Sequence, residues 1–274
     1  MGVCMFCGPT EAQITKEHVW PVWVSAALKD VMQGDTVYHR RYEGDVVAKE
    51  WQAGEINLQV KDLCTPCNRD WLGEFEGAVV KPLLAKAITT GSSLALSSIE
   101  QSTVAAWACK MAMVYEFANP GKPVFFTAAD RLAFRDTTKA LPEVEIRLAK
   151  YAFADKRFGH CHSACYDLTE AFGDRRALAL FVTTMMAGHL AMQLIAVRDR
   201  ASGALLPAAT VDVEYNGPAM ASLAQVWPTR RPRVTWPPAN VLDEEQLLRL
   251  SEMWNLGATE DRRFRSNIPL GVRP

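Results

Sequence analysis

The sequence has almost no net charge, because its 30 lysines and arginines are balanced by 31 aspartates and glutamates. This balance excludes a strongly basic protein that coats nucleic acid, although local basic patches remain compatible with it. The chain shows no internal repeat and no low-complexity tract. Its first residues, MGVCMFCG, lack the basic segment followed by an apolar segment that marks a secretory signal, so none is expected.

The cysteines are few and odd in number, at seven in 274 residues. An odd count without an export signal argues against a disulfide framework, so we expect reduced thiols and a cytoplasmic location. A chain of this length buries a sizeable core without covalent staples and suits one large or two moderate domains. The cysteines therefore need a different explanation.

One apolar run is long enough to raise the question of a membrane. Ala177–Val197 contains no Asp, Glu, Lys or Arg and has about the length of a membrane-spanning helix. Threonines, a Gly-His pair and a glutamine interrupt it, and much of it is alanine. We therefore expect two buried strands or a buried helix–turn unit, and no membrane association.

Hydrophobic periodicity predicts an α+β protein. In residues 1–90 it indicates a helix, three short strands and a second helix that follows Pro66: Pro21–Met32, Thr36–Arg41, Asp45–Trp51, Ile56–Leu63 and the segment after Pro66. The serine-rich residues 91–103 mark a domain boundary. Beyond it we expect an amphipathic helix, a helix capped by Thr127 and an antiparallel set of strands: Val104–Phe117, Thr127–Thr138, Val144–Phe153, Gly159–Leu168, Leu178–Met186, Leu190–Val197 and Ala209–Tyr215.

Four of the cysteines form two pairs with the same spacing. Cys4 and Cys7 are separated by two residues, and so are Cys64 and Cys67. Two such pairs on tight turns offer four thiolates in the tetrahedral arrangement that zinc prefers. A closed site of this kind stabilises a fold and performs no chemistry. The alternative is that one pair is coincidental or redox-active.

An acid and a base lie side by side between the two pairs. Glu17 and His18 are followed by Pro21, and Asn68 comes directly after the last cysteine. The ordered pattern C-x2-C, E-H-x-x-P, C-x2-C-N resembles the HNH endonucleases, the ββα-metal nucleases, over about the first 80 residues. The specificity of the resemblance comes from the ordered combination, since each piece alone is a weak signal.

The resemblance implies an α+β protein with two parts. Residues 1–90 would form a ββα-metal (HNH) module with a structural zinc. Residues 91–274 would form a larger mixed α+β domain with antiparallel strands, which binds substrate, a partner or a regulatory ligand. The implied activity is metal-dependent hydrolysis of phosphodiester bonds, with double-stranded DNA as the expected partner and homodimerisation left open.

The resemblance also assigns roles to individual residues. Glu17 and Asn68 would hold a catalytic Mg²⁺ or Mn²⁺, and His18 would be the general base that deprotonates the attacking water. The middle motif residue is Gln59 in strict register, or Asn57 if a bulge intervenes. Glu76 is a candidate for supporting the metal, although a solvated helix carboxylate is the expectation for it.

The chemistry explains why these residue types are needed. Hard oxygen ligands with open positions suit Mg²⁺ or Mn²⁺, which stabilises charge on a phosphoryl group. An imidazole has an intrinsic pKa near neutrality, and a positioned base contributes about 10²- to 10⁴-fold in rate. Adjacent residues on a regular strand point to opposite faces, so a turn or bulge must bring Glu17 and His18 together.

Other interpretations stay open. The module could be a catalytically decayed zinc ribbon that binds nucleic acid or protein, in which Glu17 caps a helix and His18 is structural. Paired arginines, above all Arg40-Arg41, could contact phosphates, although solvated surface charge is the default for them. A redox or metal sensor would use Cys161 and Cys165. His160 and His162 would face the other side of the same strand, so one strand cannot offer all four side chains to one ion, and a histidine pair would need ligands from elsewhere.

Overall fold

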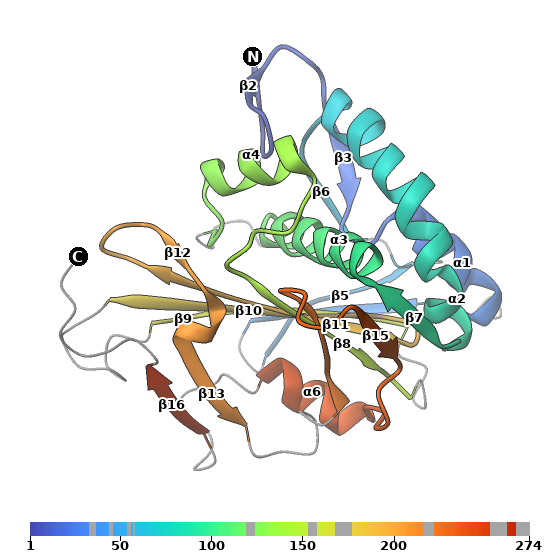
Figure 1. Cartoon of the computed structure of the whole chain (residues 1–274). Coiled ribbons are helices and arrows are strands. Elements are labelled where there is room, and N and C mark those ends of the chain that lie inside the picture. Colours follow the sequence, from blue (N-terminus) through green and yellow to red (C-terminus); the bar gives the residue numbers. More distant parts are fainter. Residues whose placement is uncertain are drawn as a thin grey trace.

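The structure is a computed structural model, which describes residues 1–32, 37–43, 46–53, 56, 58–118, 124–152, 158–167, 177–215, 222–252 and 262–266. It has a mixed α+β architecture in which the sheets are antiparallel, as the sequence predicts. Helices cover both faces of a central sheet (Figure 1).

The first part of the chain alternates short strands with helical segments. The helices and the three predicted strands lie close to their predicted positions, whereas four further strands were not predicted: Gly2–Cys4, Gly8–Thr10, Ile14–His18 and Leu94–Ser97. Two of these helical segments, η1 and η2, are π-helical and continue into α2. The elements are β1 (Gly2–Cys4), β2 (Gly8–Thr10), β3 (Ile14–His18), α1 (Val22–Met32), β4 (Val37–Glu43), β5 (Val46–Ala53), β6 (Gln59–Cys64), η1 (Pro66–Leu72), η2 (Phe75–Val80), α2 (Lys81–Thr90) and β7 (Leu94–Ser97).

The second part begins with two helices and continues mainly as strands. Thr127 caps α4 as predicted, through a capping box with Asp130. The elements are α3 (Ser98–Glu116), α4 (Ala128–Thr137), β8 (Glu145–Lys150), β9 (Gly159–Asp167), β10 (Leu178–Ala187), β11 (Leu190–Asp199), β12 (Leu205–Leu206), η3 (Ala208–Thr210), β13 (Val211–Tyr215), β14 (Ala224–Trp227), β15 (Arg233–Trp236), α6 (Glu244–Glu252) and β16 (Arg262–Ser266).

The central sheet has six strands in the order β14-β8-β11-β10-β9, with β12 paired to β11. Strands β9, β10 and β11 form the meander that the sequence predicts. Strand β8 does not pair with β9, its neighbour in sequence, but lies on the far side of β11. Strand β13 leaves the sheet and pairs with β16.

Both faces of this sheet are buried, which explains the apolar run at 177–197. Phe181 and Met185 of β10 join the core cluster that includes α3, whereas Leu180 and Val182 join a second cluster with α6. Both sets of alternate residues are therefore apolar, as in a sheet covered on two sides (Figure 1). The prediction of two buried strands is confirmed. Among the described residues, no helix is long and apolar enough to cross a membrane.

Helix α3 runs through the centre of the protein. It begins at a capping box between Ser97 and Glu100. Every residue from Val104 to Val114 is buried, so the prediction of an amphipathic helix is wrong: the helix is surrounded by protein on all sides. Its core cluster includes residues from both sides of the predicted domain boundary. The division into two domains stays a prediction.

A buried network joins α3 to the N-terminal hairpin. The Arg131 guanidinium in α4 donates to the backbone carbonyl of Met5 at 2.7 Å and also to that of Phe126. Glu116, near the end of α3, accepts hydrogen bonds from the backbone N–H groups of Phe125 and Phe126. Burial raises the pKa of Glu116 to about 7, although these hydrogen bonds and nearby arginines oppose the shift.

The turn between β10 and β11 requires glycine. Gly188 has a φ of +53°, and a Cβ atom there would lie 2.1 Å from the backbone oxygen of Ile88. Gly188→Ala should destabilise the protein by about 3 kcal/mol or more, because overpacking adds to left-handed strain. Gly203→Ala is the matched control, since Gly203 has a φ of +74° with open space around it, and strain alone should account for about 1–2 kcal/mol. Equal urea-unfolding free energies for the two variants would contradict the clash.

Glu116 should make stability depend on pH. Its folded-state pKa lies above the ordinary value, so its contribution is fully present below about pH 4.5 and is lost as pH rises through about 7. Glu116→Gln should flatten the fall in unfolding free energy between pH 5 and 8, by up to about 3 kcal/mol. Urea titrations at several pH values measure this. Glu11→Gln, at an exposed position, should leave the slope unchanged.

Candidate functional site

The two cysteine pairs come together in space. Cys4 ends β1 and Cys7 lies in the turn before β2, while Cys64 ends β6 and Cys67 lies in η1. The four sulfur atoms all lie within 4.8 Å of one another, and Cys7 Sγ is 3.6 Å from Cys64 Sγ. Zn–S bonds of about 2.3 Å in a tetrahedron place sulfurs roughly 3.8 Å apart. The cluster could hold a structural metal such as zinc.

Backbone contacts hold the two pairs against each other. The N–H of Met5 donates to the carbonyl of Asp62 at 2.7 Å, which links the first turn to β6. The N–H and the hydroxyl of Thr65 both donate to the carbonyl of Gln13, at 3.0 and 3.2 Å. Both turns are therefore fixed by the strands that carry the rest of the site.

The electrostatics of the cluster are those of crowded thiols. Burial alone would raise the pKa of Cys4, but backbone hydrogen bonds with Cys64, Cys7 and Phe6 outweigh it and lower the pKa to about 7. Burial and the neighbouring thiols raise the pKa of Cys7 to about 11, and they raise that of Cys67 further. The Cys4 thiolate therefore forms readily, whereas the thiolates of Cys7 and Cys67 need a cation beside them.

Strands β3 and β6 carry the residues between the two pairs. They pair antiparallel, with Thr15 opposite Leu63 and His18 opposite Gln59, and the register shifts between Thr15 and Glu17. The helical segment that begins at Pro66 follows β6 directly. This shift precedes Glu17, whereas Glu17 and His18 pair in regular register with Val60 and Gln59, so no bulge separates the acid from the base, contrary to the expectation from the sequence.

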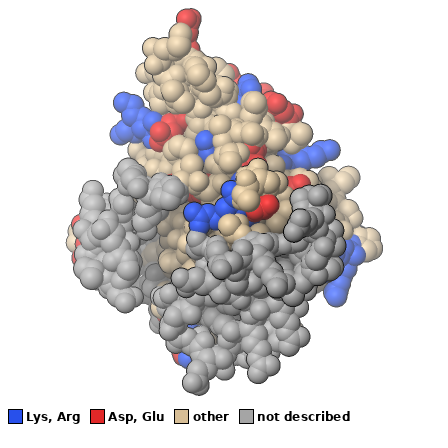
Figure 2. Space-filling view, turned by 90° about the vertical axis from the view of Figure 1, so that its left-hand side faces the viewer, with Lys and Arg blue, Asp and Glu red and all other residues tan. Residues whose placement is uncertain are grey.

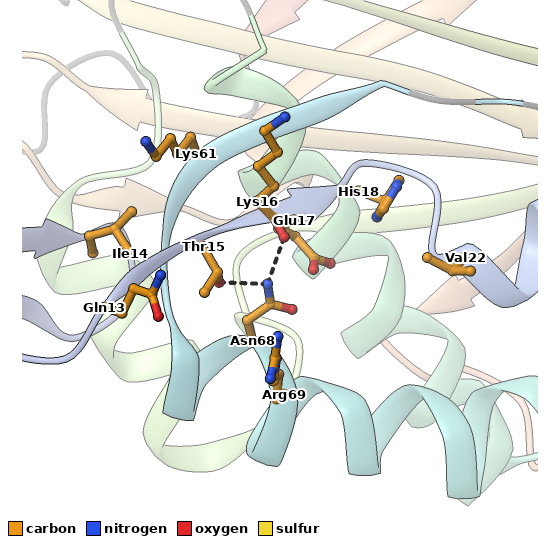
Figure 3. A pocket seen from close by; sticks show the side chains of 10 residues that line it. All are labelled: Gln13, Ile14, Thr15, Lys16, Glu17, His18, Val22, Lys61, Asn68 and Arg69. Atoms are coloured by element: carbon orange, nitrogen blue, oxygen red, sulfur yellow. Dashed lines mark hydrogen bonds between the residues drawn. The ribbon is translucent and has the colours of Figure 1, made fainter. Parts of the chain in front are cut away.

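A cleft of about 630 Å³ opens over these elements. It brings together all three predicted site residues, Glu17, His18 and Asn68 (Figure 3). In the view of Figure 3 the Glu17 carboxylate lies between the His18 ring and the Asn68 amide. The remaining lining residues are Gln13, Ile14, Thr15, Lys16, Val22, Lys61 and Arg69.

The orientation of Asn68 is fixed by its hydrogen bonds. Its Nδ2 donates to Thr15 Oγ1 and to the backbone carbonyl of Lys16, both at 2.9 Å (Figure 3). A backbone carbonyl can only accept, so the amide nitrogen must be the atom that faces β3. The amide oxygen is therefore the end left for a cation or for water.

His18 is held by its cross-strand neighbour. The side-chain amide of Gln59 lies 2.7 Å from His18 Nε2. The Gln59 atom that faces Nε2 is the amide nitrogen, which donates and so occupies Nε2, whereas a flipped amide would present its oxygen to Nε2–H and leave Nδ1 as the basic nitrogen. Either arrangement orients the ring. Gln59 thus contacts the predicted base, and Asn57, the other candidate for the middle position, lies outside the described residues.

Glu17 makes a contact that the sequence did not predict. Its Oε1 is 2.5 Å from Nζ of Lys110, which is fully buried in α3. The same ammonium group lies 3.0 Å from Glu76 Oε1, and the indole N–H of Trp107 donates to that oxygen at 3.1 Å. Glu76 is 7% exposed, so the expectation of a solvated helix carboxylate is wrong. The signal was present in VAAWACKMAMV, where one lysine stands in an apolar helix.

Charge in this cluster is largely compensated. Burial would lower the pKa of Lys110, but the two carboxylates outweigh it and raise the pKa, so the amine stays protonated. Burial raises the pKa of Glu76, although Lys110 opposes the shift. Lys110 therefore offsets the charge of Glu17 from the protein interior.

Cations surround the cleft on its solvent side. Lys16, Lys61 and Arg69 line it and are exposed. Elsewhere, the face in Figure 2 mixes basic and acidic side chains over its described surface. The backbone of Arg40 and Arg41 belongs to β4, and their side chains lie outside the part of the chain that the structure describes.

The histidines and cysteines of β9 form no second metal cluster among the described residues. His160 Nε2 lies 2.7 Å from the hydroxyl of Ser251 in α6. Cys161 is half-buried and Cys165 is exposed, on a strand in which successive side chains face opposite sides. Cys109 is a buried core residue, as expected, and burial raises its pKa to about 12.

Comparison with known proteins adds no relative: no family model, no curated protein and no solved structure matches this chain. The likeness to the HNH endonucleases therefore stays a prediction from the sequence.

The cysteine cluster predicts one tightly bound zinc per chain. Cys67→Ser should lose most of it and lower the melting temperature by about 10 °C or more, because binding energy of structural zinc is folding energy. Elemental analysis and calorimetry measure both effects. Cys165→Ser is the control and should keep the metal. Full zinc content in the Cys67 variant would rule out the four-sulfur site.

Proposed function

We propose that the protein is a metal-dependent endonuclease of the HNH type, which hydrolyses DNA phosphodiester bonds with His18 as the general base. One observation carries the proposal: Glu17 and His18 of β3 and Asn68 of η1 line a single cleft, and η1 also carries Cys67 of the cysteine cluster. These are the residues that the motif singles out.

The oxygen atoms available in the cleft fit a hard divalent cation. Glu17 offers a carboxylate and Asn68 an amide oxygen whose direction is fixed by two hydrogen bonds. These two residues would hold Mg²⁺ or Mn²⁺, which prefers such ligands together with water and phosphate oxygens. When bound, the cation would neutralise charge on the phosphoryl group and the leaving oxygen.

The protein's own residues supply the remaining functions. His18, oriented by Gln59, would accept the proton of the attacking water at a ring nitrogen. Lys16, Lys61 and Arg69 would contact phosphates on either side of the reacting bond, and sequence-independent contacts of this kind position a duplex. The proposed substrate class rests on this charge and on the motif, and homodimerisation stays a prediction.

A second candidate function has an observation in its favour. Lys110 already pairs with Glu17, and Gln59 already contacts the ring of His18. A cleft whose acid and base are both engaged fits a zinc-stapled factor that binds nucleic acid or protein without cleaving it. Such a factor would keep the three basic residues of the cleft, and it would not hydrolyse phosphodiester bonds.

Cleavage of supercoiled plasmid in Mg²⁺ or Mn²⁺ tests the proposal. The wild type should nick the plasmid, and His18→Ala should reduce the rate about 10²- to 10⁴-fold with unchanged zinc content and melting temperature. His162→Ala, on β9 and outside the residues that line the cleft, is the matched control and should nick normally. Plasmid binding without nicking in either metal would support the binding factor instead.

A further inference from the structure

The buried lysine on α3 is the feature least explained by folding alone. Lys110 is 0% exposed, and its ammonium contacts Glu17 and Glu76 at 2.5 and 3.0 Å. Fully buried lysines are rare, and replacing a buried ion cluster by apolar side chains is often neutral or stabilising. Stability is therefore a weak reason for placing this charge in the core.

The two carboxylates that share Lys110 differ in their surroundings. Glu76 lies inside the protein, where Trp107 also donates to it. Glu17 lines the cleft, and neither Glu76 nor Lys110 is among the lining residues. The ammonium group thus reaches a cleft residue from behind, through the interior. Trp107, Glu76 and the capped, enclosed helix α3 fix its position.

The charges around the cleft would oppose a free divalent cation. Glu17 is the one carboxylate among the lining residues, and Lys110 offsets it. Lys16, Lys61 and Arg69 add three positive charges on the solvent side. A phosphodiester would bring negative charge to the same place, because phosphate oxygens are strong ligands for Mg²⁺.

We propose that Lys110 is a positioning residue that offsets the charge of Glu17, so that the cleft binds a divalent cation weakly until nucleic acid supplies a phosphate. The inference rests on the proposed function and deepens it, since it states how metal loading is regulated. Cation and phosphate bind cooperatively, and by linkage each strengthens the other by the same factor.

Replacing the lysine would have two opposing effects. A misplaced ligand weakens metal binding by about 10- to 100-fold. Removing a unit positive charge beside a metal ligand strengthens metal binding. At an effective dielectric constant of about 20, this electrostatic gain exceeds the loss from the misplaced ligand. Lys110→Met should therefore tighten binding of the cation to the free protein, by about tenfold or more. A purely structural lysine predicts weaker or unchanged binding.

Mn²⁺ binding, followed by electron paramagnetic resonance of the free ion, tests the inference on the full chain with its zinc. The His18→Ala background keeps the probe, a short synthetic DNA duplex, intact. The parent should bind Mn²⁺ weakly alone and about tenfold more tightly with the duplex. Lys110→Met should bind more tightly without the duplex and gain less from it. Equal or weaker binding by Lys110→Met without the duplex would overturn the inference.

Two further variants serve as checks. Gln101→Met replaces a buried polar residue of the same helix that donates to Leu96 and Arg231, and it should bind Mn²⁺ like the parent. In Glu76→Gln, Lys110 would have Glu17 as its one carboxylate partner, so it would offset the charge of Glu17 more completely. This variant should therefore bind Mn²⁺ more weakly. This opposite sign decides the question even if Lys110→Met fails to fold, and unchanged binding in Glu76→Gln would then overturn the inference.

The failures of the two proposals are distinguishable. A wild type that never nicks plasmid, combined with the expected Mn²⁺ affinities, overturns the nuclease and supports the role of Lys110. Normal nicking combined with unchanged affinity in Lys110→Met overturns the role of Lys110 alone. No Mn²⁺ binding by the parent, with or without the duplex, overturns both.

Discussion

The contact between Lys110 and Glu17 joins the two halves of the chain at the point where the chemistry is expected. It links a strand of the N-terminal part to a helix that begins eight residues beyond α2 and is enclosed by the core. A charge can be held at this depth only if its partners are fixed. Strand β3, η2 and α3 must therefore keep one relative position. Because β3 lines the cleft, that side of the cleft is held in place as well.

The cysteine cluster fixes the other end of the same unit. It joins the N-terminal hairpin to the end of β6 and the start of η1, so both strands of the β3–β6 pair are tied at the end near Ile14 and Cys64. His18 and Gln59 lie at the opposite end of the pair. The candidate site is thus held by the sulfur cluster and by the buried ion cluster, of which Glu17 is itself a member.

The parts of the site that could be predicted from the sequence are those formed by residues close together along the chain. The cysteine pairs and the run from Glu17 to Pro21 are local patterns, and the structure brings the residues that they single out to one place. Lys110 was missed because it lies 93 residues from Glu17, and no local pattern connects them. Gln59 and Asn57 could not be separated, since strand register depends on a bulge that the sequence does not mark.

The fold was predictable to a similar degree and for similar reasons. Strands β10 and β11 follow from two apolar runs separated by a Gly-His turn, whereas the position of β8 and the pairing of β13 with β16 depend on partners far along the chain. The interpretation of α3 as amphipathic failed because alanines, which suit any environment, fill much of its surface. Burial on all sides and burial on one side then produce similar sequences.

The turn at Gly188 and His189, between β10 and β11, contacts the end of the helical arm. This arm is the run of η1, η2 and α2, which starts beside the cysteine cluster. The N–H of His189 donates to the carbonyl of Ile88 at 2.9 Å, in the last turn of α2. A carbonyl group in the last turn of a helix ordinarily accepts a hydrogen bond from water, and here the β10–β11 turn donates that hydrogen bond instead. Hairpin tips are usually the places where a chain tolerates nicking or the insertion of a new segment. This tip is built into the interior, so a chain opened or extended at that point would lose the support that holds the arm.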